Sequence, residues 1–409
     1  MSTEGQLKLE WAREHMPVCN LISERFRSEK PFKGLRISMA LHVEAKTGIL
    51  ALILKEGGAD VSLASCNPLS SDDSVVSALR NNHGIDVHAK KGIDEDTYYK
   101  YLNTVLDRKP HLVIDDGGDL VKMLHTNRTD ASVNVLGGNE ETTTGIVRLR
   151  AIEKDGILKF PMFDVNDAMM KHLFDNRYGT GQSTLDGFMH ATNLLIAGKK
   201  IVVAGYGYCG RGIAMRMRGM GGIVTVTEID PVKAVEAVMD GYTVARMNDA
   251  IRDADIVVTA TGMKDVVSYD DMLVARNGIV LCNSGHFNNE ISVSELNKRA
   301  IWKGEVRSEV RRYKLDNGNT VNVISDGRLV NLASGQGHPV EIMDMSFAIQ
   351  ALSAEYMAKH HAEMQPRVHQ IPAVIDDSVA RIKLESLKLK LDSLSESQVD
   401  YMNSWGEGT

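Results

Sequence analysis

A glycine-rich stretch between residues 199 and 230 has the spacing of a phosphate-binding turn. The apolar run 201–204 leads into Gly205-x-Gly207-x-x-Gly210, and a helical pattern follows. In such a strand-turn-helix unit the first glycine permits the turn, the second lets a pyrophosphate approach the backbone, and the third lets the helix pack close to the strand. The helix N-terminus then faces the phosphates. The spacing therefore predicts a dinucleotide site at these glycines.

An acidic residue at the end of the next apolar run indicates which dinucleotide binds. Glu228 lies 18 residues after Gly210, where a carboxylate can accept hydrogen bonds from both ribose hydroxyls and would repel a 2′-phosphate. The sequence therefore predicts NAD rather than NADP. The alternative is a glycine-rich turn in an α/β fold that binds no dinucleotide.

Two further clusters of polar side chains lie beside predicted elements. The segment 115–119 (DDGGD) follows a predicted strand, and the segment 140–145 (EETTTG) precedes a predicted helix. Ligands of open parallel sheets sit at the carboxyl ends of strands, so the acids of the first segment are site candidates; a solvated turn is the alternative. The second segment suits a helix N-cap. Three consecutive threonines exceed what a cap needs, so hydrogen bonding to a cofactor is a second interpretation.

Lys171 and Asp175 are four residues apart in a predicted helix and therefore share one face. On the surface they would form an ordinary ion pair worth only about 0.3 to 0.5 kcal/mol. In a buried cleft, the same pair could move protons, with perturbed pKa values. His286 at a predicted strand end and His338 in a glycine-flanked hinge segment are further cleft candidates, although His338 could simply cap a helix.

The elements that must hold these residues repeat a strand-helix rhythm, which predicts the α/β class with two Rossmann-like parallel sheets. In the first domain we expect strands at 35–41, 59–66, 85–89, 111–114 and 158–165, and helices at 44–54, 74–81, 95–106 and 146–154. Two short helices separated by Pro17 come before them, and Ser183 is a candidate N-cap for a helix to 197. In the second domain we expect strands at 201–204, 223–226, 256–260 and 279–283, helices at 232–239 and 269–276, and a hairpin at 313–324. Further helices are expected at 340–364 and 376–387.

Composition excludes several classes of protein. A chain of 409 residues suggests two or three domains. A net charge of −7 without a Lys/Arg stripe argues against nucleic acid as a partner. No apolar run reaches the length of a membrane helix, so we expect no membrane partner and a cytoplasmic location. Four scattered cysteines indicate neither a disulfide framework nor a zinc site, and no metal is predicted.

Collected in order, these motifs resemble the S-adenosyl-L-homocysteine hydrolase (adenosylhomocysteinase) family over nearly the whole chain. The matching segments are LH at 41–42, SCNPLSSDD at 65–73, DDGGDL at 115–120, EETTTG at 140–145, VND at 165–167, K-x-x-FDN-x-YG at 171–179, VVAGYG-x-x-G-x-G at 202–212, TEIDP at 227–231, GHF at 285–287, GRLVNL at 327–332 and GHP at 337–339.

The resemblance implies two domains joined by hinges and a small C-terminal extension. Residues 1–180 and 339–372 would bind substrate, residues 181–338 would bind NAD, and residues 373–409 would form an extension that helps to build a homotetramer. The implied substrate is a nucleoside thioether.

The resemblance also assigns site residues, matched position by position. Active-site positions are His42, Asp116, Glu141, Lys171, Asp175, Asn176 and His286, and substrate-binding positions are Glu44, Lys46, Thr47 and His338. Cofactor-binding positions are Thr142, Thr143, Thr144, Asn176, Gly205, Gly207, Tyr208, Gly210, Glu228, Thr261, Asn283, Asn331 and His338.

The implied reaction explains why a hydrolase contains an NAD site. Tightly held NAD⁺ oxidises the ribose 3′-hydroxyl, the ketone acidifies the C4′ proton, homocysteine leaves from C5′, water adds, and the hydride returns without net redox. In this scheme Lys171 and Asp175 handle the 3′-hydroxyl proton, Asp116 removes the C4′ proton, and Glu141 holds ribose hydroxyls. His42 would serve the leaving thiol or the incoming water.

Two positions at the implied purine site depart from the family. Many members have threonine and glutamate where this chain has Glu44 and Lys46. Glutamate accepts a hydrogen bond from the 6-amino group of adenine, whereas a lysine is donor-only and suits the 6-oxo group of hypoxanthine. S-inosyl-L-homocysteine is therefore an alternative substrate. Glu44 could still take over the amino group, so the adenosyl substrate stays first.

Other departures leave further alternatives open. Thr180 stands where many relatives have cysteine, and Tyr208 stands where many have an acid. The tail lacks the lysine and tyrosine that in the family reach a neighbouring subunit's NAD, which predicts looser cofactor retention. A simple alcohol dehydrogenase and a non-catalytic regulatory homologue are the competing hypotheses, although the residues expected for catalysis are intact.

Overall fold

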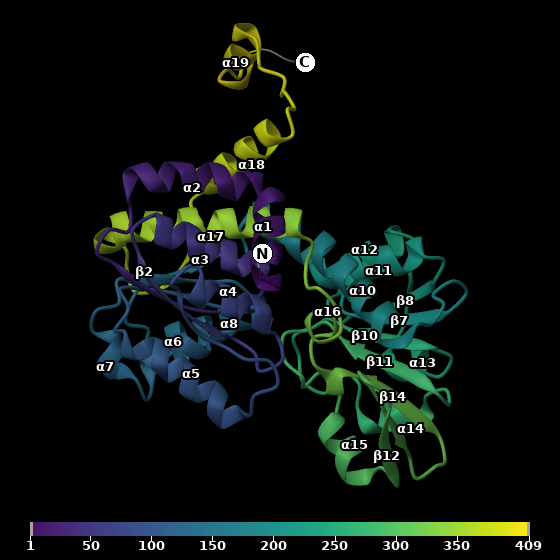
Figure 1. Cartoon of the computed structure of the whole chain (residues 1–409). Coiled ribbons are helices and arrows are strands. Elements are labelled where there is room, and N and C mark those ends of the chain that lie inside the picture. Colours follow the sequence, from purple (N-terminus) through teal and green to yellow (C-terminus); the bar gives the residue numbers. More distant parts are fainter. Residues whose placement is uncertain (1–2, 407–409) are drawn as a thin grey trace.

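The computed structural model describes residues 3–406 and contains two lobes, each built on a twisted sheet covered by helices (Figure 1). The first lobe holds the strands up to Asp164 and the late strand Val368–Gln370, and the second holds the strands from Lys200 to Ile324. The predicted α/β class with two Rossmann-like sheets is confirmed.

The first sheet is parallel throughout, in the order β3-β2-β1-β4-β5-β6-β15. Its strands are β1 (Arg36–Leu41), β2 (Asp60–Ser65), β3 (Asp86–His88), β4 (Leu112–Asp115), β5 (Gly137–Glu140), β6 (Met162–Asp164) and β15 (Val368–Gln370). Its helices are α1 (Glu4–Glu14), α2 (Pro17–Glu29), α3 (Ala45–Glu56), α4 (Asp73–Asn81), α5 (Glu95–Asp107), α6 (Asp119–His125), α7 (Thr129–Ser132), α8 (Thr143–Lys154), α9 (Met169–His172), α17 (Val340–His360) and α18 (Ala373–Ser386).

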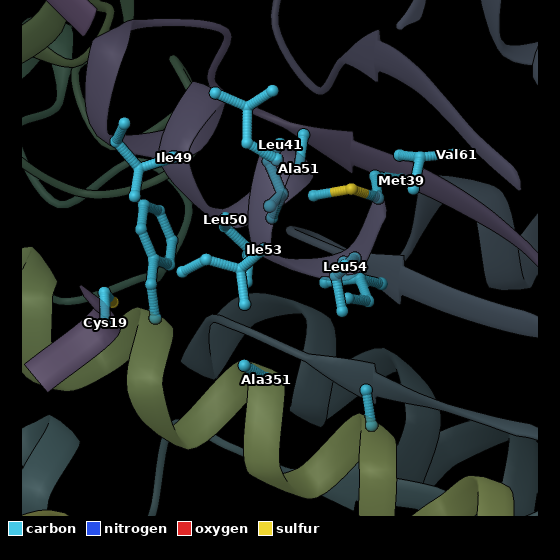
Figure 2. Close-up of a cluster of buried hydrophobic side chains, with 14 of the residues drawn as sticks. Cys19, Met39, Leu41, Ile49, Leu50, Ala51, Ile53, Leu54, Val61 and Ala351 are labelled. Carbon is cyan, nitrogen blue, oxygen red and sulfur yellow. The ribbon is translucent and has the colours of Figure 1, made fainter. Parts of the chain in front are cut away.

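A buried layer of helices supports this sheet. The residues of α3 from Lys46 to Leu54 are all buried, because the helix lies between the strands and α17. Figure 2 shows Ile53 and Leu54 of α3 above α17, where Ala351 is small enough to let the two helices approach. Most of α17 is buried as well, and its buried residues include five polar ones, Asp344, Ser346, Gln350, Ser353 and Glu355.

The second sheet has the order β12-β13-β14-β11-β10-β7-β8-β9. Its strands are β7 (Lys200–Ala204), β8 (Ile223–Thr227), β9 (Thr243–Val244), β10 (Ile256–Thr259), β11 (Ile279–Asn283), β12 (Trp302–Arg307), β13 (Val310–Lys314) and β14 (Thr320–Ile324). Helices here are α10 (Thr180–Thr192), α11 (Tyr208–Gly219), α12 (Pro231–Met239), α13 (Met247–Ala250), α14 (Tyr269–Val274), α15 (Val293–Arg299) and α16 (Val330–Ala333), with short turns η1 (Asp175–Gly179) and η2 (Ser325–Gly327). A third short turn, η3 (His361–Glu363), follows α17 in the first lobe. The antiparallel hairpin predicted at 313–324 is confirmed as β13 and β14.

Both sheets reverse their strand order at one point. The reversal lies between β1 and β4 in the first sheet and between β7 and β10 in the second. In open parallel sheets the crevice at the carboxyl ends of such strands is the ligand site. The residues after β1 and β4, and those after β7 and β10, are therefore the ones that the fold exposes to a ligand.

Several local predictions were wrong. Ser183 does not cap a helix, because the wide turn η1 runs directly into α10 and places Ser183 inside that helix. The long helix ends at His360 rather than at residue 364. Strand β5 was not predicted because it begins with Gly137 and Gly138, which are more typical of turns.

The chain ends in an arm that stands away from the first lobe (Figure 1). It continues from α18 through an irregular segment into α19 (Glu396–Met402). Residues 407–409 of the predicted C-terminal extension, and residues 1 and 2 of the predicted substrate domain, lie outside the described residues. None of the helices among residues 3–406 is both long enough and apolar enough to cross a membrane.

Candidate active site

Two adjoining cavities lie where the carboxyl ends of the two sheets meet. The smaller, of about 140 Å³, is lined by residues after β1, β4 and β5 and by α17. The larger, of about 1210 Å³, follows the glycine loop and the end of β8. Both are lined by Thr142, Thr143, Asn176, Cys209, Ser284 and His286. A molecule in one cavity would therefore contact a molecule in the other.

Lys171 lies at the centre of the smaller cavity. Its Nζ donates to Oδ1 of Asn176 at 2.8 Å and to Oδ1 of Asn166 at 3.3 Å. Carboxylate oxygens of Glu141 and Asp175 lie 3.5 and 3.6 Å from the same nitrogen. Lys171 is only 4 % exposed and Asp175 only 3 %. The interpretation as a surface ion pair is therefore wrong, and the pair lies in a cleft.

The charges of this group depend on each other. Burial alone would lower the pKa of Lys171, but the carboxylates of Asp175 and Glu141 outweigh burial and raise that pKa. Burial would raise the pKa of Asp175, but Lys171 and His338 hold it well below its usual range. Burial raises the pKa of Glu141 to about 8, against the opposing effect of Lys171. Near neutral pH the group thus contains an ammonium, one carboxylate and a largely protonated Glu141.

Helix α17 fixes the two acids from behind. Ser346 donates to Oδ2 of Asp175 at 2.7 Å, and Gln350 donates through Nε2 to Oε2 of Glu141 at 2.6 Å. The amide oxygen of Gln350 in turn accepts from Asn139 at 2.9 Å. Sequence reasoning did not single out Ser346 or Gln350. No local signal marks them, because the same helix also carries other polar residues, such as Asp344, Ser353 and Glu355.

A second group joins the two lobes through Asp116. Its Oδ2 lies 3.4 Å from Nε2 of His42, and its Oδ1 lies 3.6 Å from Nδ1 of His286. On its other side His42 Nδ1 is 2.6 Å from Oγ of Ser70 and 3.3 Å from Sγ of Cys66. Asp116 thus contacts one histidine from each lobe.

The protonation of the two histidines follows from their surroundings. Burial lowers the pKa of His42 to about 4. The carboxylate of Asp116 opposes this decrease, whereas His286, His338 and Lys46 add to it. Burial also lowers the pKa of His286. Both rings are therefore neutral near pH 7 and can accept a proton. The donor atoms of His42, Asp116 and His286 lie within 4.8 Å of one another, close enough to share a metal ion, so the absence of a metal stays a prediction.

Two deeply buried acids hold the loops that carry these residues. Asp115 accepts from the backbone amides of Asp116 and Val121, and Glu140 accepts from those of Gly117 and Thr142. Burial raises the pKa of both acids, that of Asp115 to about 8. Since their carboxyl groups face backbone rather than a cavity, we assign them to positioning.

The purine-binding residues predicted by the resemblance lie at one end of the smaller cavity. Glu44 is the N-cap of α3 and accepts from the amides of Lys46 and Thr47. Nζ of Lys46 lies 3.2 Å from the Glu44 carboxylate and donates to the carbonyls of Gln336 and His338. Glu44 is thus partly used by its own helix, and Lys46 has three acceptors around it.

The glycine loop has the geometry that its spacing predicts. Gly205 has a φ of +94°, which favours glycine, and a Cβ at Gly210 would lie 1.9 Å from the carbonyl oxygen of Gly205. A Cβ at Gly207 would meet nothing within 4 Å, because it would point into open space. Gly207 is the N-cap residue of α11, so the helix N-terminus opens on the larger cavity.

The remaining cofactor residues divide into two groups. Glu228 lines the larger cavity, and its carboxylate accepts from the backbone amides of Tyr206 and Ile229 at 2.7 Å. Thr261 also lines it, but its hydroxyl donates to Glu290. Asn283 differs from the prediction: it is fully buried, lines neither cavity, and bonds Thr259 and the backbone of neighbouring loops. It holds the loop that presents His286.

The residues around the junction of the cavities fit NAD. Asn331 is 3 % exposed and lines the smaller cavity, yet its Oδ1 has no hydrogen-bond partner among the described residues. A buried acceptor of this kind suits an amide donor such as the carboxamide of nicotinamide. The open space at Gly207 and the carboxylate of Glu228 suit a pyrophosphate and a ribose, respectively.

The structure thus brings nearly all predicted site residues to the two cavities. The smaller cavity is lined by His42, Glu44, Lys46, Thr47, Asp116, Glu141, Thr142, Thr143, Lys171, Asp175, Asn176, His286, Asn331 and His338. The larger is lined by Thr142, Thr143, Thr144, Asn176, Gly205, Gly207, Tyr208, Glu228, Thr261 and His286. Gly210 lines neither and acts through helix packing, and Asn283 lies behind the site.

Comparison with known proteins gives two family-level matches. Residues 1–135 match S-adenosyl-L-homocysteine hydrolase, and residues 176–337 match S-adenosyl-L-homocysteine hydrolase, NAD binding domain. Together the matches cover well over half of the chain.

Curated relatives match over the full length. An adenosylhomocysteinase of Thermoplasma acidophilum is 65% identical over 407 residues, which is 100% of this chain and 99% of the relative. The S-inosyl-L-homocysteine hydrolase of Methanocaldococcus jannaschii is 54% identical over 406 residues, 99% of this chain and 97% of the relative. That of Methanosarcina mazei is 51% identical over 405 residues, 99% and 98%. Both substrate names therefore occur among close relatives.

Proposed function

The chain belongs to the S-adenosyl-L-homocysteine hydrolase family, and from this we propose that it reversibly hydrolyses S-adenosyl-L-homocysteine to adenosine and L-homocysteine with NAD as cofactor. One observation carries the proposal. The buried group of Lys171, Asp175 and Glu141 lines a cavity that adjoins the glycine-loop cavity. A nucleoside bound there would have an acid-base group and the cofactor in contact with one ribose.

The chain's own residues supply the proton transfers. Lys171 and Asp175 hold and move the proton of the ribose 3′-hydroxyl, and Glu141, fixed by Gln350, binds a ribose hydroxyl. Asp116 removes the C4′ proton. Homocysteine then leaves C5′ as a thiolate. His42, which is neutral near pH 7, takes one proton from the water that adds at C5′ and passes it to that thiolate, while Asp116 returns its proton to C4′. Proton transfers of this kind contribute about 10²- to 10⁴-fold each.

The dinucleotide would be held at its pyrophosphate by Gly205 and Gly207, at one ribose by Glu228, and at the carboxamide of nicotinamide by Asn331. When bound, NAD supplies a reversible hydride acceptor, so oxidation and reduction of the ribose cancel within one turnover. The net change is addition of water across the thioether carbon–sulfur bond.

The test is to incubate purified protein with S-adenosyl-L-homocysteine and assay both free homocysteine and net NADH. We expect homocysteine without net NADH, and a loss of about 10²-fold or more in Lys171→Met, because an ammonium that carries a proton is replaced by an apolar chain of similar length. Lys154→Met, at the exposed end of α8, is the matched control. Stoichiometric NADH would instead indicate a dehydrogenase, and no product at all would indicate a non-catalytic homologue.

S-inosyl-L-homocysteine is a second candidate substrate, favoured by the position of Lys46. Its side chain lines the smaller cavity, and its ammonium would bind the purine by exchanging one of its three present acceptors, which are Glu44 and the carbonyls of Gln336 and His338. The carboxylate of Glu44 is engaged by the first turn of α3. A donor at this place suits a 6-oxo group better than a 6-amino group. Comparison of kcat/KM for the two substrates decides between them. A strong preference for the adenosyl substrate, unchanged in Lys46→Gln, would exclude the inosyl alternative.

Domain boundaries, oligomeric state and location are also proposals. We propose that 1–180 with 339–372 binds substrate and that 181–338 binds NAD, since the two sheets divide between these ranges. We propose a homotetramer, supported by the apolar C-terminal arm. A cytoplasmic location accords with four free cysteines, none of them in a disulfide among residues 3–406. Loose retention of NAD, tested by dialysis, stays a prediction.

A further inference from the structure

Arg148 connects the two lobes beside the catalytic group. It lies on α8 of the first lobe, and its guanidinium carbon is 4.5 Å from the centre of the Phe287 ring, which follows β11 of the second lobe. One guanidinium nitrogen donates to Oδ1 of Asp119 at 2.7 Å and to the carbonyl oxygen of Gly117 at 2.9 Å. Arg148 therefore contacts the residues after β4 and an aromatic ring of the other lobe at the same time.

Both ends of this connection lie next to the contact between Asp116 and His286. Gly117 follows Asp116 directly in the chain, and Phe287 follows His286. A Cβ at Gly117, whose φ is +107°, would lie 2.4 Å from Nε2 of His286, so the imidazole ring packs directly on the glycine backbone. The ring centroids of His286 and Phe287 are 4.9 Å apart in an edge arrangement. Movement of either Phe287 or Gly117 would therefore displace His286.

The other hydrogen bonds at this place fix backbone atoms rather than the Phe287 ring. Asn283 donates to the carbonyl oxygen of Phe287 at 2.8 Å, and the amide of Gly117 donates to Glu140 at 2.8 Å. Among the described residues, Arg148 is the one cation that lies over the Phe287 ring. A guanidinium can donate in its plane while its face lies on an aromatic ring, whereas the ammonium of a lysine is a point charge without such a plane.

We propose that Arg148 is a positioning residue, which holds Phe287 on the residues after β4 and so keeps His286 in place. There His286 contacts Asp116, which in the proposed function removes the C4′ proton; the inference rests on that function for its kinetic consequences. The simpler alternative is an ion pair with Asp119 that acts only within the first lobe. Partly exposed pairs of this kind contribute little to stability.

The test separates two partial reactions of the proposed mechanism. With adenosine bound, oxidation of the 3′-hydroxyl is followed by the absorbance of reduced NAD, and removal of the C4′ proton by its exchange with deuterium from heavy water. We expect Arg148→Ala to slow C4′ exchange about 10- to 100-fold, because a small displacement of reacting groups costs this much. The rate and yield of NAD reduction should stay nearly unchanged, because Arg148 does not contact the group of Lys171.

Two further variants distinguish the proposal from the simple ion pair. Arg148→Lys keeps a cation near Asp119 but loses the planar group, so it should slow C4′ exchange as well. Phe287→Leu removes the aromatic face and should slow the same step, and the double variant Arg148→Ala with Phe287→Leu should be no slower than Arg148→Ala alone. Normal C4′ exchange in Arg148→Lys or in Phe287→Leu would overturn the proposal.

Arg150→Ala is the matched control. Arg150 lies on the same helix and donates to the carboxylate of Glu153 and to the backbone carbonyl of Val368, both in the first lobe. We expect it to leave both partial reactions unchanged. If Arg150→Ala slowed C4′ exchange as much as Arg148→Ala, the effect would belong to α8 as a whole and the proposal would fail.

Amide hydrogen exchange of residues 285–289 separates this proposal from the proposed function. If the wild type releases no homocysteine and shows no C4′ exchange, the proposed function fails. The contact with Phe287 still predicts faster amide exchange in this segment for Arg148→Lys and Phe287→Leu than for the wild type and Arg150→Ala. Unchanged amide exchange in the first two variants would refute the positioning role even in an active enzyme.

Discussion

At the scale of single residues, the site is organised by charges that are buried yet balanced. Lys171 and Asp175 form an ion pair. Glu141, whose pKa is raised to about 8, is largely protonated near neutral pH. An unpaired buried charge would cost several kcal/mol, so a proton that moves within this group without changing its total charge is far less costly than one that leaves it. This explains why three ionisable groups are placed around one ribose-sized cavity.

His42 gives a prediction about pH because its ring stays neutral in the folded state. Its pKa is about 4 there and 6.5 in the reference state. Between these values the unfolded chain binds more protons than the folded one, so stability rises with pH across this window and falls as pH drops from 6.5 to 4. The shift corresponds to at most roughly 3 kcal/mol. His42→Gln lacks this ring, so this loss of stability at low pH is absent in the variant.

Melting temperatures of the wild type and His42→Gln, compared at pH 7 and at pH 4.5, check this. We expect the melting temperature of the variant to rise relative to that of the wild type as the pH falls, because only the wild type has a His42 ring that takes up a proton on unfolding. A difference between the two proteins that stays constant over this range would mean that His42 titrates alike in both states. His190→Gln, at an exposed histidine near the end of α10, is the control for the loss of a histidine elsewhere in the chain.

The sequence predicted the residues that touch the cavities better than those that support them. Asp116, Lys171 and Glu228 lie in motifs whose spacing or family resemblance marks them. Gln350 and Ser346 were missed because the sequence of α17 does not show which of its polar residues bond the site; their partners, Glu141 and Asp175, are known only from the fold. Asn283 was assigned to the cofactor, yet its side chain faces backbone, which no local pattern could reveal.

At the scale of elements, α17 gives a prediction about positioning. Gln350 donates to Glu141 and accepts from Asn139, so Gln350→Ala leaves Oε2 of the buried Glu141 without this donor, while Asn139 keeps its bond to the backbone carbonyl of residue 350. The substitution should cost about 1 to 3 kcal/mol of stability, with a lower kcat. Ser353 lies almost one turn further along, also buried, and its hydroxyl has no partner among the described residues. Ser353→Ala should therefore be neutral in both melting temperature and kcat. Equal effects of the two substitutions would refute this role for Gln350.

The glycine loop gives a prediction that separates folding from cofactor binding. Gly210→Ala places a methyl group against the Gly205 carbonyl and should lower the melting temperature of the NAD-free protein. Gly207→Ala points into open space and should leave that temperature unchanged. Both should weaken NAD binding, measured by titration calorimetry, because the methyl group at Gly207 would occupy the approach of the pyrophosphate. A Gly207→Ala protein that binds NAD normally would contradict the predicted pyrophosphate position.

Elements with strong periodicity were predicted, and short or glycine-containing ones were not. Strands β1, β7 and β11 are apolar runs that the sequence shows directly. Strands β5 and β15 are short, and only pairing makes them recognisable as strands: β5 pairs with β4 and β6, and β15 pairs with β6. The turn η1 could not be predicted either, because a wide helical turn has no composition of its own; it nevertheless places Asp175 and Asn176 beside Lys171.

At the scale of the whole molecule, the site exists because two similar sheets meet at their carboxyl ends. Asp116 follows β4 of the first sheet and His286 follows β11 of the second, and their side chains lie 3.6 Å apart. Residues from both lobes also line the two adjoining cavities. Separation of the lobes would therefore break the contact between Asp116 and His286, so the site is complete only when the two sheets are held in this arrangement.

The exposed side chains of the C-terminal arm support the proposed oligomer. Beyond α18 the arm exposes Leu389, Leu391 and Met402, each more than half exposed, and Trp405 at 99 %. The second lobe exposes Ile229 at 93 % and other apolar side chains of α12. A run of apolar residues on a segment that packs on nothing in its own chain is typical of an interface rather than of a free surface.

The assembly can be tested by charging the arm. Leu391→Glu combined with Met402→Glu should shift the molar mass, measured by light scattering after size exclusion, from an oligomer toward the monomer of 45.0 kDa, because two carboxylates would have to be buried without partners. Ser393→Glu with Asn403→Glu adds the same charge at polar positions of the arm and should leave the mass unchanged. If the first variant keeps the wild-type mass, the arm is not part of the interface, and the apolar side chains of α12 would need another partner.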